Sequence, residues 1–339
     1  GHLTALRDLL KDQGRPLACF AMGSGGLASR VLALAWGSHW VFAPLAGETP
    51  TASGQIPLEE LANVYHVTEV TADTPLFGVV GNPVAHSRSP HLHNTWFREN
   101  GLHAVYVPFF VQNLQVEIRA LEALGVRGLS VAVPHKQAAL EVAAHADSAT
   151  RAVRACNTLL RDGERWRGMN TDGPGVREAI LKTLYDGPRP ERPFAGQEVV
   201  VVGAGGAASA AAYALRDAKS VVILNRHLDR ARDLAIHFNR HVGAGYRTPT
   251  FSAAPLESLK HTQAEIVIQA TSVGMEGGPP GVPVPATALP SSTRLVVDMI
   301  YAPEETAFVI ACRERALNVQ NGMPMLCEQA RLKFAEFSK

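Results

Sequence analysis

Residues 199–215 read VVVVGAGGAASAAAYAL. Four consecutive valines predict a strand that is buried on both faces, as in a parallel sheet. Gly203 follows at once and allows a tight turn, while the alanine-rich residues 206–215 favour a helix. The stretch therefore predicts a strand, a glycine turn and a helix whose first N–H groups point back into the turn.

The glycine turn has the form GxGxxG/A in the context that this motif requires, between an apolar strand and a helix. Gly203 permits the turn, Gly205 permits close approach of a ligand to the backbone, and the helix N-terminus attracts an anion. We therefore predict a Rossmann domain that binds a dinucleotide pyrophosphate. The predicted contacts are Gly203, Gly205, Gly206 and Ala207. The alternative is a strand–helix turn that is tight for packing reasons alone.

The residues after the next predicted strand, 221–224, indicate which dinucleotide binds. NAD-binding sites usually have an acidic residue about 20 positions after the first glycine. This chain instead has Asn225 and Arg226, with Arg230 shortly after. Two arginines can bind a 2′-phosphate through charge-assisted hydrogen bonds, so we predict NADP as the cofactor. The alternative is two solvated arginines at the start of a helix.

Apolar strands and helical segments alternate through the rest of the chain, which predicts α/β domains with parallel sheets. Loops rich in Pro and Gly are expected at 185–193 and 277–285. Further strands are predicted at 76–80, 105–111, 128–134, 266–270 and 295–299. Three helices are predicted as well: one that begins near residue 91, one that ends at residue 124 and one that begins at residue 136. Residues 1–70 predict helices at 3–11, 29–36 and 56–64 and strands at 16–22 and 40–45.

Composition limits the class of protein. The net charge is +1, from 32 basic and 31 acidic residues, which gives no charge pattern typical of nucleic-acid or membrane-surface binding. No apolar stretch reaches the ~18 residues of a membrane span, and no secretory signal is recognisable. The four cysteines are widely spaced, as expected for reduced thiols in a cytoplasmic protein. A plastid location remains open as an alternative.

Three further segments place polar residues in apolar surroundings: Ser87-Arg88-Ser89-Pro90, Val133-Pro134-His135-Lys136 and Asn170-Thr171-Asp172-Gly173. Their order and spacing, together with the glycine turn and Asn225-Arg226, resemble shikimate dehydrogenase over about residues 74–339. The resemblance implies an open α/β substrate-binding domain (residues 74–173 and 322–339) and a Rossmann NADP-binding domain (174–321). It also implies shikimate and 3-dehydroshikimate as the small-molecule substrates.

The resemblance also implies roles for individual residues. Lys136 and Asp172 match the catalytic pair. The substrate-binding residues of the family match Ser87, Ser89, Asn157, Tyr301 and Gln329. Thr271, Ser272 and Met275 match the loop beneath the nicotinamide. A lysine beside a carboxylate can hold a hydroxyl and transfer its proton, and which of the two is the formal base stays open.

Several residues depart from the family pattern. Ser130 and Ala132 stand where asparagine and threonine are usual, so that the preference between shikimate and quinate stays open. Gln269 replaces an asparagine and His227 a threonine. A quinate-oxidising enzyme and a non-catalytic metabolite sensor are the alternatives to a shikimate dehydrogenase, and a sensor would be expected to lose Lys136 and Asp172. We expect no metal site, although His86, His91 and His93 lie close in sequence.

The first 70 residues resemble the last two βα units of a type I dehydroquinase, a (β/α)8 barrel. Arg30 matches the arginine that binds the substrate carboxylate in that family, and Gln55 matches a residue of its closing loop. The lysine of that family's Schiff base has no counterpart in the chain, so we expect no dehydroquinase activity from it. The resemblance implies a piece of a longer bifunctional enzyme, whose remaining barrel would be the partner of this segment.

Overall fold

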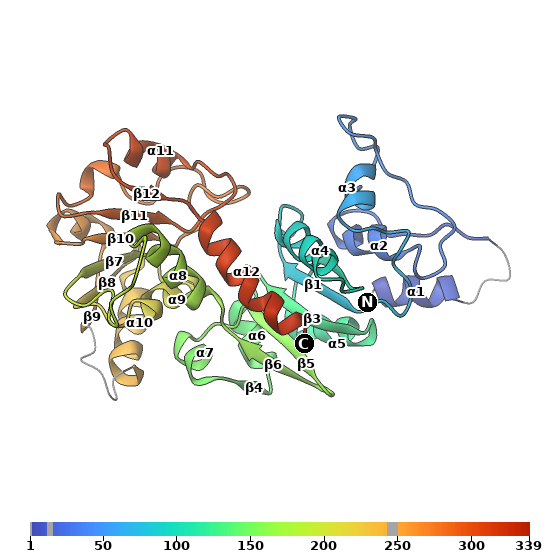
Figure 1. Ribbon diagram of the computed structural model, residues 1–339, viewed down its shortest axis with the longest axis horizontal. Helices are drawn as coiled ribbons and strands as arrows, with labels where there is room; N and C mark the ends of the chain where they lie inside the picture. Colours follow the sequence, from blue (N-terminus) through green and yellow to red (C-terminus); the bar gives the residue numbers. More distant parts are fainter. Residues whose placement is uncertain (1, 12–15, 243–249) are drawn as a thin grey trace. The chain divides into compact units, whose positions relative to one another are not determined.

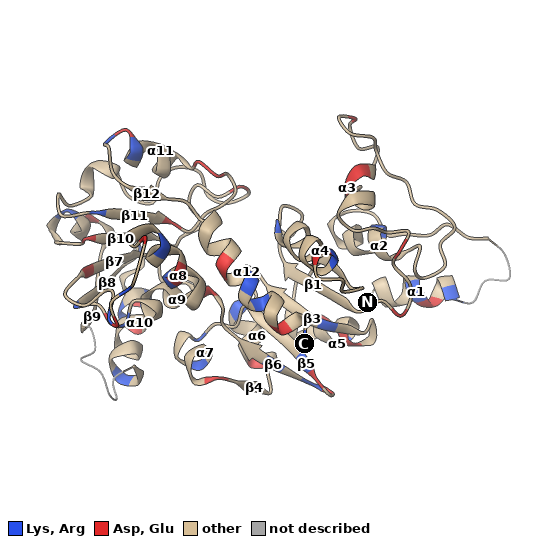
Figure 2. Cartoon of the chain, in the orientation of Figure 1, with Lys and Arg blue, Asp and Glu red and all other residues tan. Residues whose placement is uncertain are grey.

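The computed structural model describes residues 2–11, 16–242 and 250–339 (Figure 1). The chain divides into two compact units. The first consists of Gly1–Asp147, Cys156–Met169 and Lys333–Lys339, and the second of Ser148–Ala155 and Asn170–Leu332. Figure 2 shows that acidic and basic residues are interspersed along both units, in agreement with the near-neutral net charge. None of the helices formed by the described residues is both long and apolar enough to cross a bilayer.

The first unit is built on a six-stranded mixed sheet with the order β2-β1-β3-β5-β6-β4. Its strands are β1 (Leu76–Gly81), β2 (Val105–Phe110), β3 (Val126–Val131), β4 (His145–Ala146), β5 (Thr158–Asp162) and β6 (Arg165–Met169). β1 pairs in parallel with β2 and β3, whereas β5 runs antiparallel to both β3 and β6. The helices between these strands are α4 (Ser89–Glu99), α5 (Leu114–Ala123) and α6 (Lys136–Val142).

β1 is the inner strand of the parallel part of this sheet, and all six of its residues are buried. Gly78 is required there because a Cβ atom would lie 2.4 Å from the carbonyl oxygen of Val107 and 2.5 Å from the ring of Phe109. Phe77 packs on Phe337, near the end of α12 (Met323–Phe337), with ring centroids 5.1 Å apart. The last residues of the chain therefore complete the core of the first unit.

A buried polar group lies within this core. The His93 ring stacks on Tyr106 at 4.4 Å, and burial lowers the pKa of His93 to about 3, so that the imidazole is neutral. The hydroxyl of Tyr106 donates a 2.6 Å hydrogen bond to Ser130 Oγ. Ser130, one of the departures from the family pattern, is thus a buried partner of Tyr106.

In the N-terminal part of the chain, η1 and α2 pack against β2 of the first sheet (Figure 1). The regular elements of the described residues in 2–11 and 16–75 are α1 (His2–Lys11), η1 (Ser24–Gly26), α2 (Leu27–Leu32) and α3 (Leu58–Asn63). Leu27 and Val31 of α2 belong to the same buried cluster as β1 and β2. The three helices predicted for this region are confirmed, with α2 shorter than expected.

The two strands predicted at 16–22 and 40–45 are wrong, because no described residue between 16 and 75 is in a strand. A strand needs a neighbour to take up its N–H and C=O groups. The first segment is hydrogen-bonded to the residues just before the second, from His39 N–H to Leu17 O (2.9 Å) and from Cys19 N–H to Ser38 Oγ (3.1 Å), and the rings of Phe20 and Phe42 lie 5.9 Å apart. Trp40 and Phe42 remain 52% and 58% exposed. Apolar sequence alone does not make a strand without a sheet to join.

The second unit contains a six-stranded sheet with the order β12-β11-β10-β7-β8-β9, and all of its pairings are parallel. The strands are β7 (Glu198–Val202), β8 (Ser220–Leu224), β9 (Thr250–Ala254), β10 (Ile266–Gln269), β11 (Leu295–Asp298) and β12 (Val319–Gln320). The helices are α7 (Ser148–Val153), α8 (Asp172–Leu184), α9 (Gly206–Ala214), α10 (Leu228–His241) and α11 (Ala307–Arg313), with short turns η2 (Leu256–His261) and η3 (Ala286–Ala288). This is the strand order of a dinucleotide-binding Rossmann domain.

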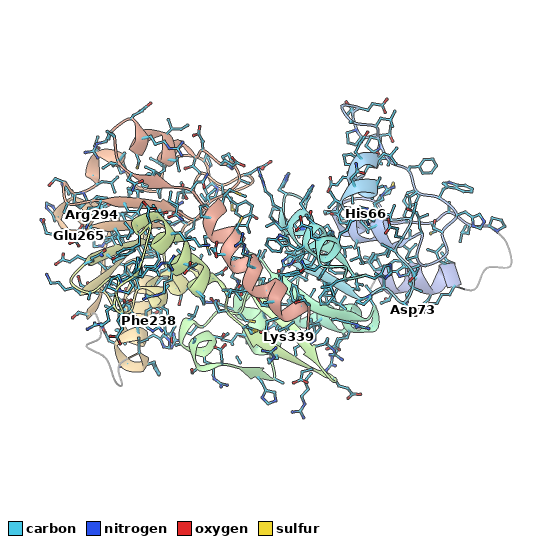
Figure 3. All side chains as sticks on the ribbon, viewed as in Figure 1. His66, Asp73, Phe238, Glu265, Arg294 and Lys339 are labelled. Atoms are coloured by element: carbon cyan, nitrogen blue, oxygen red, sulfur yellow. The ribbon has the colours of Figure 1, made fainter. Side chains whose placement is uncertain are left out.

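Alternate residues of these strands face two different cores. Val199 and Val201 of β7 pack with α8, α9 and α10, while Val200 and Val202 pack with α11, η2 and η3. Phe238 of α10, labelled in Figure 3, is fully buried in the first of these cores. Helical layers on both faces explain why β7 is a continuous apolar run. The strands predicted at 199–202, 221–224, 266–270 and 295–299 are confirmed.

Gly78 provides a test of the packing in the first unit. Gly78→Ala should lower the free energy of unfolding by about 1–3 kcal/mol, because the methyl group has no space between β1 and β2. Thermal unfolding should show a lower melting temperature. Gly25→Ala is the control, since a Cβ there has nothing within 4 Å. Equal melting temperatures for the two variants would contradict the described packing.

Candidate active site

Three loops of the second unit meet at the carboxyl edge of its sheet. They follow β7, β8 and β10, which are neighbours and parallel. The chain leaves β7 toward β8 on one side and returns to β10 on the other, so that the order of strands reverses at this point. Ligands of open α/β sheets bind at such a switch point. The opposite edge is marked by Glu265 and Arg294, which precede β10 and β11 (Figure 3).

The glycine turn lies at the centre of this edge. Gly203 has φ +121°, and its N–H donates a 2.7 Å hydrogen bond to the carbonyl oxygen of Leu224 at the end of β8. A Cβ at Gly203 would lie 3.0 Å from the carbonyl oxygen of Ala270 after β10. Gly203 therefore joins three strand ends, and a side chain would separate them.

Gly205 has a different role from Gly203. A Cβ at Gly205 would have nothing within 4 Å, and the N-terminus of α9 that follows has no side-chain cap. Gly206 and Ala207, the first residues of α9, are half-buried. Open space beside the backbone and uncapped N–H groups fit a pyrophosphate, which needs close approach and hydrogen-bond donors.

The loop after β8 supplies positive charge. Arg226 and Arg230 are exposed, and neither forms an ion pair with any described residue. The backbone carbonyl of His227 accepts hydrogen bonds from Asn225 Nδ2 (3.0 Å) and from the N–H of Arg230 (3.1 Å). These bonds fix the backbone that bears both arginines at the start of α10. The loop can receive an anionic group such as a 2′-phosphate.

The loop after β10 contains Thr271, Ser272 and Met275. Thr271 and Met275 are half-buried and Ser272 is exposed. The loop packs against the glycine turn, since a Cβ at Gly203 would lie 3.2 Å from Thr271 Cγ2. Its far end is tied to the next loop by a 2.8 Å hydrogen bond from the N–H of Glu276 to the carbonyl oxygen of Ala302.

That next loop, after β11, contains the half-buried Tyr301. Asp298 is fully buried at the end of β11, where it accepts hydrogen bonds from Thr306 Oγ1 (2.6 Å) and from the N–H of Ile300 (3.0 Å). Burial raises the pKa of Asp298, and the two donors act in the opposite direction. Asp298 thus anchors the loop of Tyr301, a role that the sequence did not reveal.

Asp172 and Gln329 lie on two helices of the second unit that touch. Asp172 is the first residue of α8 and is 4% exposed. A Cβ at Gly175, one turn later, would lie 2.7 Å from Gln329 Cβ of α12, so that glycine permits this contact. The hydroxyl of Thr171 donates a 3.3 Å hydrogen bond to Gln329 Oε1. A carboxylate at the first turn of α8 is favoured by the helix dipole.

Ser87 and Ser89 follow β1 in the first unit. Ser89 is the buried first residue of α4, and its N–H donates a 3.3 Å hydrogen bond to Ser87 Oγ. Two hydroxyls near a helix N-terminus are suited to binding a carboxylate. Ala132, after β3, lies against the same turn, since a Cβ at Gly81 would be 3.2 Å from its methyl group.

Lys136 and Asn157 lie at the same carboxyl edge of the first sheet. Lys136 is half-buried at the start of α6, and its carbonyl oxygen accepts a 2.8 Å hydrogen bond from the N–H of Cys156. Asn157 is fully buried, and its backbone bridges Val131 of β3 and Met169 of β6. Burial raises the pKa of Cys156 to about 11, so that its thiol stays protonated beside these residues.

The structure thus groups the predicted residues by unit. Ser87, Ser89, Lys136 and Asn157 share one edge of the first sheet. The carboxyl edge of the second sheet bears the glycine turn and the loop residues Asn225, Arg226, Thr271, Ser272, Met275 and Tyr301, with Arg230 in the first turn of α10. Asp172 and Gln329 are joined through α8 and α12. Among the described residues, no group of three or more His, Cys, Asp or Glu side chains could hold a metal ion.

Comparison with protein families matches three segments of the chain to family models. Residues 79–159 match the shikimate dehydrogenase substrate-binding domain, and residues 190–275 match the shikimate/quinate 5-dehydrogenase family. Residues 2–72 match type I 3-dehydroquinase, as the resemblance of this segment predicted.

Individual relatives agree with the family models. The bifunctional chloroplastic 3-dehydroquinate dehydratase/shikimate dehydrogenase of Arabidopsis thaliana is 32% identical over 333 residues, which are 95% of this chain and 54% of that protein. The chain therefore spans about half of that relative. Shikimate dehydrogenase (NADP(+)) of Bacillus subtilis is 33% identical over 76% of this chain and 90% of its own length.

A solved structure is similar in fold as well as sequence. Shikimate 5-dehydrogenase of Thermus thermophilus, in complex with NADP(H) and shikimate, matches with a TM-score of 0.66 and 32% identity, over 78% of this chain and 94% of its own. Since the similarity covers nearly the whole length of these dehydrogenases, the chain belongs to the shikimate dehydrogenase family.

Proposed function

We propose that this chain is an NADP-dependent shikimate dehydrogenase that interconverts shikimate and 3-dehydroshikimate. The observation that supports it best is the second sheet's switch point, where an open glycine turn lies beside a loop with two unpaired arginines. Such a site fits a dinucleotide with a 2′-phosphate. The identity of the substrate is inferred from the family to which the chain belongs.

We assign substrate binding to the first unit. The hydroxyls of Ser87 and Ser89 would bind the substrate carboxylate, and Asn157 would bind the ring hydroxyls. Tyr301 and Gln329 match further substrate-binding residues of the family. NADP, when bound, supplies the acceptor for the hydride that leaves the substrate carbon. The backbone of Gly203–Ala207 and the guanidinium groups of Arg226 and Arg230 would hold the dinucleotide.

Lys136 and Asp172 carry out the proton chemistry. Lys136 and Asp172 would hold the reacting hydroxyl by hydrogen bonds, and its proton would pass to the base of the pair, either the carboxylate of Asp172 or the uncharged amine of Lys136, as the carbonyl forms. In the opposite direction the ammonium stabilises the negative charge that develops on the carbonyl oxygen. Asp172 is well placed for a fixed role, because it is buried at the start of a helix that is held against α12.

Quinate is a second candidate substrate. The matching family model covers both shikimate and quinate dehydrogenases. Ala132 also lacks the hydroxyl that the family usually has at the carboxyl end of β3, beside the turn that leads to Ser87. Steady-state rates with shikimate and quinate at equal NADP decide between them, and a higher kcat/KM for quinate would reverse the assignment. A metabolite sensor without turnover would give no NADPH with either acid.

Lys136→Ala tests the proposed mechanism. We expect kcat with shikimate to fall by a factor on the order of 10²–10⁴, because general acid–base catalysis contributes that much. NADPH formation is followed by its absorbance. The control is Lys260→Ala, which removes an exposed lysine from η2 and should leave kcat unchanged. Full activity of Lys136→Ala would exclude this lysine from catalysis.

Replacing the two arginines tests the choice of cofactor. Arg226→Ala and Arg230→Ala should each lower kcat/KM for NADP by roughly 10- to 100-fold, since a hydrogen bond to a charged group contributes about 1.5–3 kcal/mol. The value for NAD should change little. The matched control is Arg232→Ala, because Arg232 lies on α10 with Arg230 but is paired with Asp229 at 3.3 Å. Equal losses for NADP and NAD would show that neither arginine contacts a 2′-phosphate.

We further propose that residues 2–72 bind the remainder of a type I dehydroquinase barrel. Met22, Trp40 and Phe42 are more than half exposed on the two segments that lack strand partners. Arg30 is 1% exposed, and its Nε and Nη1 atoms have no hydrogen-bond partner among the described residues. Although the guanidinium stacks on the Phe20 ring at 4.1 Å, its two unsatisfied nitrogens and the exposed apolar segments indicate an incomplete core.

The barrel proposal is tested by binding. The chain is mixed with the part of the Arabidopsis thaliana relative's dehydratase domain that precedes the region matched here. Co-elution in size-exclusion chromatography is expected. Phe42→Asp should abolish it, whereas Val116→Asp, a change of an exposed valine on α5, should not. Separate elution of the unaltered chains would contradict this docking surface.

A further inference from the structure

Gln269 is the last residue of β10, at the point where the strand order of the second sheet reverses. It is fully buried. Its backbone carbonyl accepts a 3.0 Å hydrogen bond from the N–H of Met299, and the next N–H, of Ala270, donates to the carbonyl oxygen of Val202 at 2.8 Å. The backbone at Gln269 is therefore fixed on both sides by β7 and β11.

The side chain of Gln269 holds the loop that follows it. Its Oε1 accepts a 2.5 Å hydrogen bond from the N–H of Thr271, and its Nε2 donates to the carbonyl oxygens of Thr271 (3.2 Å) and Val273 (3.3 Å). An amide side chain has two N–H donors and one carbonyl acceptor. All of these are directed at one loop, and none at the strands or helices that form the core.

The loop held by Gln269 is closed by further bonds of its own. The N–H of Val273 donates to Thr271 Oγ1 at 3.2 Å, and the N–H of Gly274 donates to the carbonyl oxygen of Pro279 at 2.8 Å. Gly274 has φ +89°, which favours glycine. The loop is thus a compact turn, with Gln269 at its base and the glycine turn of Gly203 beside it.

We propose that Gln269 is a positioning residue that sets the nicotinamide half of NADP through the loop of Thr271–Met275. The inference rests on the proposed function. Without the amide, one half-buried N–H and two half-buried carbonyl oxygens lose this partner, and a group left fully buried and unsatisfied would cost about 1–3 kcal/mol. The N–H and C=O groups of the loop would then bind water or other partners, and the loop would shift. The adenosine half would be held elsewhere, through its 2′-phosphate, by Arg226 and Arg230.

This division of contacts predicts a split in binding. Gln269→Leu keeps the size of the side chain and removes all three hydrogen bonds. It should weaken binding of NADP roughly 10-fold or more, while binding of adenosine 2′,5′-bisphosphate, which lacks the nicotinamide half, should change by less than about 2-fold. With shikimate, kcat should fall on the order of 100-fold, since a displacement of about 1 Å at the reacting atoms costs that much.

Two variants serve as comparisons. Gln269→Asn restores the amide, one methylene shorter, and should recover at least part of the loss in NADP affinity. Gln320→Leu removes another buried amide of the same sheet, which accepts a 2.9 Å hydrogen bond from Thr183 Oγ1. It should leave the ratio of the two affinities unchanged, even if it lowers the melting temperature.

Isothermal titration of the two ligands decides the proposal without turnover. Equal weakening of NADP and adenosine 2′,5′-bisphosphate by Gln269→Leu would reduce Gln269 to a structural residue and overturn the proposal. So would unchanged affinity for both ligands. If the unaltered chain oxidises neither shikimate nor quinate, the proposed function fails, and the titration still decides the role of Gln269.

Discussion

Parallel pairing of buried strands is the constraint on which both units depend. Parallel strands place all their carboxyl ends at one edge, so that loops far apart in sequence meet there. In the second unit Gly203 makes this convergence tight, because its N–H bonds to Leu224 and its α-carbon lies against Ala270. Three strands end within the reach of one glycine. The loops that follow these strands therefore lie together at one site.

The first unit meets the same constraint in a different way. Its parallel strands β1 and β3 bring Ser87 and Lys136 to one edge, but Asn157 arrives there at the beginning of a strand. This is possible because β5 runs antiparallel to β3, so that its first residue lies beside the last residues of β3. A mixed sheet thus adds a buried amide to an edge otherwise formed by loops after strands.

Much of this arrangement could be predicted from sequence. The valine run before Gly203, the polar turns around Ser87 and Lys136, and Arg226 are local signals whose physical meaning does not depend on distant residues. Their positions after strands were enough to place them at sheet edges. The hairpin of β5 and β6 was missed, although Asp162-Gly163 is a turn signal between the two strands. Its charged residues concealed the alternation.

Other features could not be predicted because they depend on which groups the fold brings together. The apolar segments at 16–22 and 40–45 have strand-like sequences, but a strand exists only where a neighbour takes its hydrogen bonds. Gln269 and Asp298 are ordinary polar residues in sequence. Their roles follow from loops, closed several residues later, that supply the N–H and C=O groups these side chains bind.

The departures from the family pattern separate into two kinds in the structure. Ser130 does not change the site directly, because its hydroxyl is bound to Tyr106 within the core. His227 leaves α10 without a side-chain cap, but its backbone still accepts the bonds that fix Arg226 and Arg230. Gln269 and Ala132 lie at the sheet edges themselves. Gln269 holds a loop through three side-chain hydrogen bonds, whereas the methyl group of Ala132 can form no hydrogen bond. Differences in cofactor geometry and substrate choice from other members of the family should therefore arise from these two positions rather than from Ser130.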